Sequence, residues 1–454
     1  MAFQSINPVT GECLGTYDEW TDGQIDQALA LAHRASNEWA ETPVVDRCEA
    51  VRAVGRVLKE RRNALAKLIT LEMGKLIGEA RAEVDKCAAS CDYYADHGPA
   101  FLSDDVMDSD AGRSFLAYEP LGPVLAVMPW NFPFWQVLRF AAPALVGGNV
   151  ALLKHAANVP QCALALQDIF IETGLPEGVF TTLMIGSARV RSVIEDPRVR
   201  AVTLTGSEAA GRAVASIAGT QLKKTVLELG GSDPFVVLED AELALATEVA
   251  LTSRLINAGQ SCIAAKRFIV VDSVADAFIE GLLSAVGRYH HGDPLDEQTT
   301  LAPLARKDLL DDLHDQVLKS IEQGARPVLG CTPVKGVGAN YPVSILDGVR
   351  PNMTAGREEL FGPVFSILRV RDEAAAIRIA NDTTFGLGAS VWTGDTDRGE
   401  RIARQIQAGA VFVNGLVKSD PRLPFGGVKD SGYGRELSYL GLYEFLNIKT
   451  VWIR

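Results

Sequence analysis

Val226-Leu227-Glu228-Leu229-Gly230-Gly231 opens the stretch of sequence that decides the fold, and Asn257-Ala258-Gly259-Gln260-Ser261-Cys262 closes it. The first segment predicts an apolar strand that ends in an acid and two glycines. Asp240 is expected to cap a helix that stops at Gly259. The apolar positions of this helix recur at helical spacing, at Leu243, Ala246, Val249 and Ala250. Because Arg267 to Val271 predicts another strand, Cys262 is expected at a helix-to-strand junction, where folds often expose reactive side chains.

Strand and helix patterns alternate on both sides of this stretch. Before it, strands are predicted at Ser114 to Tyr118, Pro123 to Met128, Asn149 to Leu153, Thr181 to Met184 and Ala201 to Leu204, with a helix at Pro160 to Glu172. After it, strands are predicted from Phe235 and at Phe268 to Val271, Phe365 to Val370 and Ala410 to Gly415, with a helix near Val274 to Tyr289. This alternation is typical of parallel, doubly wound sheets that can hold a dinucleotide. The predicted fold class is α/β, with two closely apposed doubly wound domains and a cleft between them.

The first hundred residues carry helical periodicity instead. Thr21 and Asp22 are expected to cap a first helix. Its apolar face is formed by Ile25, Ala28, Leu29 and Ala32. A second helix is predicted through Val51 to Leu58 and a third through Ala80 to Tyr94. We expect these three helices to act as scaffold.

Composition limits the classes of function. The 454 residues have a net charge of −13 and no compensating basic tract, so nucleic acid and anionic membranes are poor partners. Seven cysteines without a CxxC pair argue against a disulfide framework and a zinc site, so we expect no metal and a reducing, cytoplasmic location. The N-terminus lacks the basic and apolar regions of a signal peptide. Residues 122–153 are strongly apolar, but their prolines and glycines make a membrane span unlikely to form.

Three residues are candidates for catalytic chemistry. Cys262 has small neighbours that leave room for a substrate, although a lone cysteine is more often a buried apolar residue and no basic side chain lies directly beside it in sequence. Glu228 ends an apolar strand, where partial desolvation would suit a general base; a solvated strand-end carboxylate is the alternative. Asn131 lies between Pro129 and Pro133, which would hold its amide as an oxyanion donor.

Two further segments are candidates for binding a cofactor. Thr205 to Gly211 follows a strand and opens a helix, which suits a phosphate, although it does not match GxGxxG. Lys154 ends an earlier strand, at a place where NAD sites often carry an acid.

Taken together, these segments resemble the aldehyde dehydrogenase superfamily over essentially the whole chain. The resemblance rests on six motifs in order: Pro129 to Pro133, Thr205 to Ser207, Glu228 to Gly231, Gly259 to Cys262, Glu359 to Pro363 and Pro424 to Gly427. It implies that Cys262 attacks an aldehyde, with the Asn131 amide and the Cys262 backbone N–H stabilising the oxyanion. Hydride transfer to the nicotinamide then leaves a thioester, which Glu228 helps water to hydrolyse.

The same resemblance implies where a dinucleotide binds. Glu359 and Phe361 are similar to residues that hold the nicotinamide ribose and ring, and Gly206, Ser207 and Trp130 to those around the phosphates and adenosine. Ala157 replaces an acid that many NAD-using members carry three residues after Lys154. We therefore expect NADP to be preferred, with NAD possible as a second cofactor.

Two further segments, Gly230 to Phe235 and Leu153 to Ala156, resemble those of the shorter bacterial succinate-semialdehyde dehydrogenases within the superfamily. This implies that Arg139 and Ser419 bind the distal carboxylate, in a substrate pocket shared with Trp135 and Ser261; pairing of Arg139 with a core acid is the alternative. Phe140 replaces a lysine that acts as a proton relay in many relatives. Ile263 and Ala264 replace a second cysteine, so no redox gating is expected.

Other functions stay open. Glutarate semialdehyde or an uncharged aldehyde could be the substrate, and a catalytically silent scaffold of the same fold is possible. Transfer of the acyl group to coenzyme A is disfavoured by Glu228, which suits hydrolysis.

The resemblance also predicts a division of the chain. Residues 1–112 and 123–230 are expected to form the dinucleotide-binding domain and residues 231–430 the catalytic domain. Residues 113–122 and 431–454 are expected to be oligomerisation strands, which makes a homodimer the minimum assembly and a tetramer the alternative.

Overall fold

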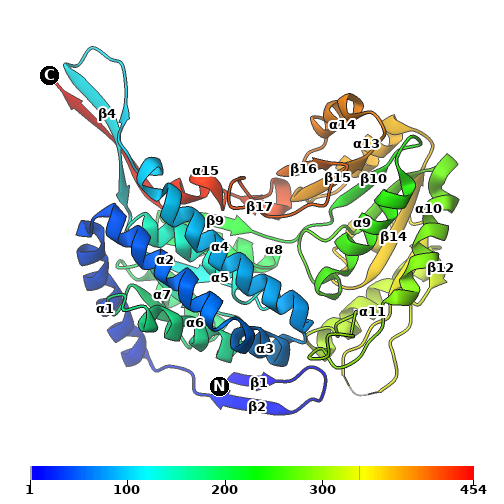
Figure 1. Ribbon diagram of the computed structural model, residues 1–454, viewed down its shortest axis with the longest axis horizontal. Helices are drawn as coiled ribbons and strands as arrows, with labels where there is room; N and C mark the ends of the chain where they lie inside the picture. Colours follow the sequence, from blue (N-terminus) through cyan, green and yellow to red (C-terminus); the bar gives the residue numbers. More distant parts are fainter. Residues whose placement is uncertain (1–2, 337) are drawn as a thin grey trace.

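The computed structural model describes residues 3–336 and 338–454, and it has two lobes, each built on a mainly parallel sheet (Figure 1). The six-stranded sheet has the order β17-β9-β8-β5-β6-β7. Its strands are β5 (Pro123–Val127), β6 (Val150–Lys154), β7 (Phe180–Thr182), β8 (Ala201–Thr205), β9 (Lys224–Glu228) and β17 (Gly432–Tyr433). All are parallel except β17, which pairs antiparallel with β9. The chain runs from β5 outward to β7 and returns to β8 on the other side, so the topological switch point lies between β5 and β8.

The second lobe carries a seven-stranded sheet of order β12-β13-β14-β11-β10-β15-β16. Its strands are β10 (Pro234–Val237), β11 (Arg267–Val271), β12 (Arg326–Leu329), β13 (Ser344–Asp347), β14 (Val364–Val370), β15 (Gly388–Trp392) and β16 (Ala410–Val413). The edge strand β12 is antiparallel and the others are parallel. The predicted α/β class with doubly wound sheets is confirmed.

Helices cover the faces of both sheets. In the first lobe these are α1 (Asp22–Glu41), α2 (Val44–Glu60), α3 (Arg62–Met73), α4 (Ile77–Phe101), α5 (Trp135–Val146), α6 (Pro160–Glu172), α7 (Val190–Glu195) and α8 (Glu208–Thr220). In the second lobe they are α9 (Leu243–Leu255), α10 (Asp272–Ala285), α11 (Lys307–Glu322), α12 (Thr354–Arg357), α13 (Glu373–Asn381) and α14 (Thr396–Ala403), while α15 (Ser438–Tyr443) lies near the C-terminus.

The N-terminal helices correct one prediction. Thr21 caps α1 with a capping box, as expected, but four helices follow instead of three. The additional helix, α3, begins directly after α2, with Arg61 as the residue between them. Neither glycine nor proline marks this break, which is why the sequence pattern did not reveal it.

Two further predictions, both about the helix before Cys262, are wrong. Asp240 is not the cap of α9: Glu242 accepts the Leu245 N–H at 3.0 Å, while Asp240 accepts hydrogen bonds from the Thr393 hydroxyl. The α-helix ends at Leu255, before Gly259, and a turn over Ile256–Gly259 follows, in which Asn257 and Ala258 have left-handed backbone angles (φ of 52° and 53°). Tertiary contacts of this turn, described below, account for the early end.

A small three-stranded sheet projects from the first lobe. β4 (Arg113–Pro120) pairs antiparallel with β18 (Leu446–Ile453) and β3 (Asp105–Val106), and the β4–β18 arm extends away from the helices at the upper left of Figure 1. β1 (Phe3–Ile6) and β2 (Cys13–Tyr17) form a hairpin at the lower edge. β18 is an edge strand of this small sheet and exposes Ile448 and Trp452.

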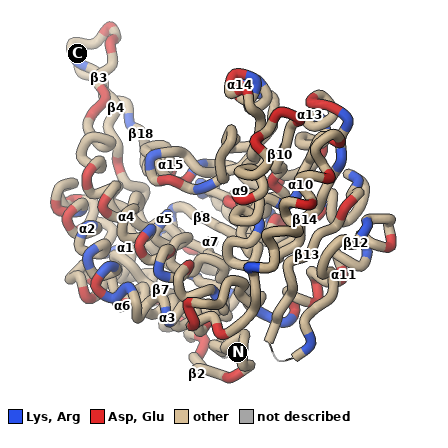
Figure 2. Tube along the Cα trace, turned by 45° about the vertical axis from the view of Figure 1, so that its right-hand side comes forward, with Lys and Arg blue, Asp and Glu red and all other residues tan. Residues whose placement is uncertain are grey.

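Charged residues of both signs are interspersed over the two lobes (Figure 2). Among the residues that the structure describes, no helix has both the length and the apolar composition to cross a membrane. Within residues 3–336 and 338–454, no cluster of His, Cys, Asp or Glu is arranged to hold a metal ion.

Candidate active site

A cavity of about 440 Å³ lies between the two lobes and is lined by all four predicted substrate residues. From the first lobe it is bordered by α4 and α5, and from the second by the turn that carries Cys262. Five of the predicted residues line it: Arg139, Trp135, Ser261, Cys262 and Ser419. The volume is enough for a small aldehyde.

The turn before Cys262 is held from inside the protein. The buried Arg254 guanidinium donates to the carbonyls of Gly259 at 2.8 Å, Ala265 at 2.9 Å and Leu360 at 3.1 Å. Gly259 has a φ of +79°, and a Cβ there would lie 2.3 Å from the Gly362 carbonyl oxygen. Glycine is therefore required at this position by both the backbone and the lack of space.

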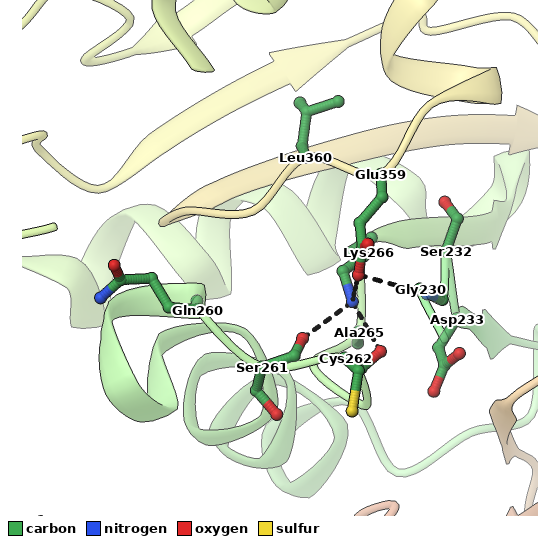
Figure 3. A network of polar contacts seen from close by, with 12 residues as sticks. Gly230, Ser232, Asp233, Gln260, Ser261, Cys262, Ala265, Lys266, Glu359 and Leu360 are labelled. Atoms are coloured by element: carbon green, nitrogen blue, oxygen red, sulfur yellow. Dashed lines mark hydrogen bonds and ion pairs between the residues drawn. The ribbon is translucent and has the colours of Figure 1, made fainter. Parts of the chain in front are cut away.

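Lys266 holds the same turn from its other side, as Figure 3 shows. Its ammonium donates to the carbonyls of Ser261 at 2.9 Å and Cys262 at 2.7 Å, and it pairs with Glu359 at 3.0 Å. The Lys266 side chain therefore points toward the loop that carries Cys262.

Desolvation is the main influence on the pKa of the Cys262 thiol. Cys262 is half-buried, and the protein around its sulfur desolvates the thiol and raises its pKa to about 12, although nearby Arg139 and Lys266 both favour the thiolate. The thiol is therefore protonated at neutral pH before substrate and cofactor bind, and a base is needed to activate it.

We expect alkylation of Cys262 by iodoacetamide to accelerate roughly tenfold per pH unit between pH 7 and 9, because only the thiolate reacts. Mass spectrometry of the labelled peptide gives the rate, and the exposed Cys13 reports access of the reagent in the same sample. A rate that levels off below pH 9 would contradict the raised pKa.

The side-chain amide and the backbone carbonyl of Asn131 are both held by hydrogen bonds. Its Nδ2 donates to the Gln260 carbonyl at 3.0 Å, and its Oδ1 accepts from Gln136 Nε2 at 3.0 Å. Its backbone carbonyl accepts from Lys75 and from Asn257 Nδ2, both at 2.9 Å. Since an amide NH₂ carries two hydrogens, one stays available for an oxyanion.

Glu228 ends β9 and is 2% exposed, so the alternative of a carboxylate in water is wrong. Both of its oxygens lack a hydrogen-bond partner among the described residues. Burial, and then the charge of nearby Glu436, raise its pKa well above the ordinary value. Glu228 is not one of the residues that line the cavity. Its carboxylate lies against Gly426, where a Cβ would come within 2.8 Å of Oε1.

Arg139 is paired with a core acid, as the alternative from sequence allowed. Its guanidinium forms a buried ion pair with Glu436, and its Nη2 donates to Thr205 Oγ1 at 3.3 Å. The guanidinium also lies 4.7 Å from the centre of the Phe425 ring. Arg139 is 3% exposed and still borders the cavity.

The predicted nicotinamide residues lie beside the two glycines after Glu228. Glu359 accepts the Gly231 N–H at 3.2 Å, and a Cβ on Gly230 would come within 2.6 Å of its Oε2. The Phe361 ring meets the Trp130 ring edge-on, with 6.0 Å between centroids. The glycines therefore permit a close approach of Glu359 to the backbone.

The predicted phosphate residues lie at the carboxyl ends of β6 and β8, beside the switch point. Ser207 caps α8 by accepting the Ala210 N–H at 3.4 Å, and Gly206 precedes it. Lys154 is half-buried, with its pKa lowered by burial, and Ala157 is exposed. A cation, a helix N-terminus and a small side chain at this edge fit a dinucleotide with an added phosphate.

Sequence reasoning missed the contribution of α4, which it treated as scaffold. Glu79, Glu83 and Lys86 of this helix all line the cavity. Glu83 pairs with the buried Lys75 and accepts the Trp135 N–H at 3.0 Å, and Glu79 accepts the Asn257 N–H at 2.9 Å. The signal that could have revealed them is a row of charges spaced four and three residues apart, which places them on one helical face.

The chain is similar to known proteins over its whole length. Residues 1–451 match the aldehyde dehydrogenase family. The chain is 51% identical over 453 residues to a probable succinate-semialdehyde dehydrogenase (NADP(+)) of Synechocystis sp., covering 100% of both. It is 48% identical to a succinate semialdehyde dehydrogenase (NAD(P)+) of Escherichia coli, covering 99% of this chain and 97% of that one. The crystal structure of succinic semialdehyde dehydrogenase from Streptococcus pyogenes in complex with NADP+ superimposes with a TM-score of 0.98 at 40% identity, covering 100% of both chains. The chain belongs to the aldehyde dehydrogenase family.

Proposed function

We propose that the protein oxidises succinate semialdehyde to succinate, with NADP+ preferred over NAD+. The names of the relatives support this substrate and cofactor. The observation that carries the proposal is the cavity, which has the Cys262 thiol on its wall and the cations Lys86 and Arg139 on the same lining. A short aldehyde with a carboxylate at its other end matches that combination of groups.

Cys262 is the proposed nucleophile. Solvent takes up the proton of the thiol, the thiolate sulfur bonds to the aldehyde carbon, and the carbonyl π electrons move to the oxygen. The free amide hydrogen of Asn131 and the backbone N–H of Cys262 stabilise that oxyanion. When bound, NADP+ supplies the acceptor for the hydride that leaves the same carbon.

Glu228 is the proposed general base. It takes a proton from water, which attacks the thioester carbon; the C–S bond breaks and succinate is released. Its raised pKa suits a group that must gain and lose a proton. Because the carboxylate lies outside the cavity lining, it must turn toward Cys262 to act.

The cofactor is proposed to lie across the carboxyl edge of the six-stranded sheet. Gly206, Ser207 and Trp130 would surround its phosphates and adenosine, and Glu359 and Phe361 its nicotinamide ribose and ring. Lys154 provides a cation for a 2′-phosphate, and Ala157 leaves the space that an acid would occupy.

We propose the same division of the chain that the sequence predicts, with residues 231–430 as the catalytic domain. Pairing of the β4–β18 arm between subunits would give at least a homodimer. The proposed location of the protein is the cytoplasm. Gel filtration with light scattering measures the assembly.

The test is the initial rate of cofactor reduction with succinate semialdehyde, measured with NADP+ and with NAD+ at matched concentrations. We expect a saturable rate that is higher with NADP+ and lower with glutarate semialdehyde or butanal. A faster rate with butanal would overturn the substrate, and a faster rate with NAD+ would overturn the cofactor preference.

A further inference from the structure

We propose that Lys86 of α4 anchors the distal carboxylate of the substrate and sets the preference for a charged aldehyde. The inference rests on the proposed function and deepens it. Lys86 lines the same cavity as Cys262. Its ammonium donates to Ser419 Oγ at 2.6 Å and lies 4.3 Å from the centre of the Trp135 ring.

Three other cations line the cavity: Lys418 is exposed, Lys75 pairs with buried Glu83, and Arg139 is also paired. The Arg139 guanidinium pairs with buried Glu436 and donates to Thr205. A substrate carboxylate would have to share Arg139 with that acid. In the described part of the chain, by contrast, Lys86 forms no ion pair with a carboxylate, and its ammonium donates a hydrogen bond to a hydroxyl.

Lys86 and Ser419 together form an anion site that is assembled before substrate binds. The ammonium has three hydrogens, and Ser419 uses one of them. Because the Ser419 oxygen accepts from Lys86, its own hydrogen is available to donate to a carboxylate. The face of the Trp135 ring attracts the ammonium and limits where it can point. Two donors can therefore meet the two oxygens of one carboxylate.

Burial and the neighbouring charged groups together set the pKa of Lys86. Burial, and then the charge of Arg139, lower the pKa of Lys86 to about 8. Glu83 on the same helix and Asp420 beside Ser419 act in the opposite direction, as does Cys87. A bound carboxylate would offset the desolvation of the ammonium.

Steady-state kinetics of Lys86→Met with succinate semialdehyde and with butanal test the proposal. Loss of a charge-assisted contact is expected to lower kcat/KM for succinate semialdehyde by about 10- to 100-fold, mainly through KM. The value for butanal should change by less than about twofold, which also shows that the variant folds. Lys67→Met, at an exposed lysine of α3, is the matched control and should behave as wild type.

Competition by succinate provides a second measurement that needs no variant. In the wild-type protein, inhibition of butanal oxidation by succinate is expected to weaken as pH rises through about 8, because the Lys86 ammonium loses its proton. Thermal stabilisation by succinate in the absence of cofactor should weaken over the same range and disappear in Lys86→Met.

The outcomes separate the two proposals. If wild-type protein does not favour succinate semialdehyde over butanal, both the proposed substrate and the proposed role of Lys86 are wrong. If wild type has that preference and Lys86→Met retains it, the substrate stands and Lys86 is not the anchor. Equal losses with both aldehydes, or succinate inhibition that does not change with pH, would likewise overturn the role of Lys86.

Discussion

Glu228→Gln is expected to lower steady-state kcat by about 10²- to 10⁴-fold and still to release a rapid burst of reduced cofactor. The amide has nearly the shape of the carboxylate, but it cannot take a proton from water. Cys262 can therefore be acylated once, after which the thioester persists. Stopped-flow absorbance should record a burst of about one equivalent per subunit, followed by a slow phase, as accumulation of an acyl-enzyme predicts.

The control for this substitution is Glu280→Gln, at an exposed glutamate of α10, which should retain wild-type rates. If the burst disappears together with the slow phase, Glu228 is required before the thioester forms. Because Cys262 is protonated at neutral pH, that result would assign Glu228 to the activation of the thiol and not to hydrolysis.

Arg139→Met is expected to destabilise the protein by about 3–5 kcal/mol, since it leaves Glu436 buried without its counter-charge. Neighbouring Glu228 adds to the penalty because its oxygens also lack partners in the described structure. The double variant Arg139→Met/Glu436→Leu should recover most of the loss, because apolar side chains can replace a buried ion pair. Urea unfolding followed by tryptophan fluorescence gives the values, and the double-mutant cycle isolates the pair.

The loss in Arg139→Met should be larger at pH 8 than at pH 5. Burial raises the pKa of Glu436, and Arg139 opposes that rise. Without Arg139 the carboxyl takes up a proton more readily on folding, so the free energy of unfolding falls as pH increases. Equal destabilisation at both pH values, or no recovery in the double variant, would show that Arg139 contributes mainly by packing against Phe425.

Substitution of Arg139 and substitution of Lys86 should have different effects on the rates of oxidation. Arg139→Met alters the electrostatic environment of Glu228, so it should slow oxidation of succinate semialdehyde and of butanal alike. Lys86→Met should affect the charged substrate alone. The same two aldehydes thus distinguish a residue that supports the base from one that binds the carboxylate.

Local patterns predicted much of the fold correctly. The helix Pro160–Glu172, the cap at Thr21 and the strand that ends at Glu228 all lie where expected. Predictions failed where distant contacts overrode local preference. α9 ends early because the Asn257 amide N–H donates to Glu79 of α4 and its side chain donates to the Asn131 carbonyl. Such contacts leave no signal within the segment itself.

By itself, the sequence determined the α/β class and the segments that carry Cys262, Glu228 and Asn131, because periodicity and turn residues act over a few neighbours. It did not predict the order of the strands within each sheet, or the strands β12, β13 and β15. Only the tertiary structure decided the electrostatics of these groups. It buried Glu228 without a partner, paired Arg139 with Glu436 and brought Lys86 of a predicted scaffold helix into the cavity. Desolvation and ion pairing depend on which distant side chains exclude water from a group, and packing of the two lobes sets that arrangement.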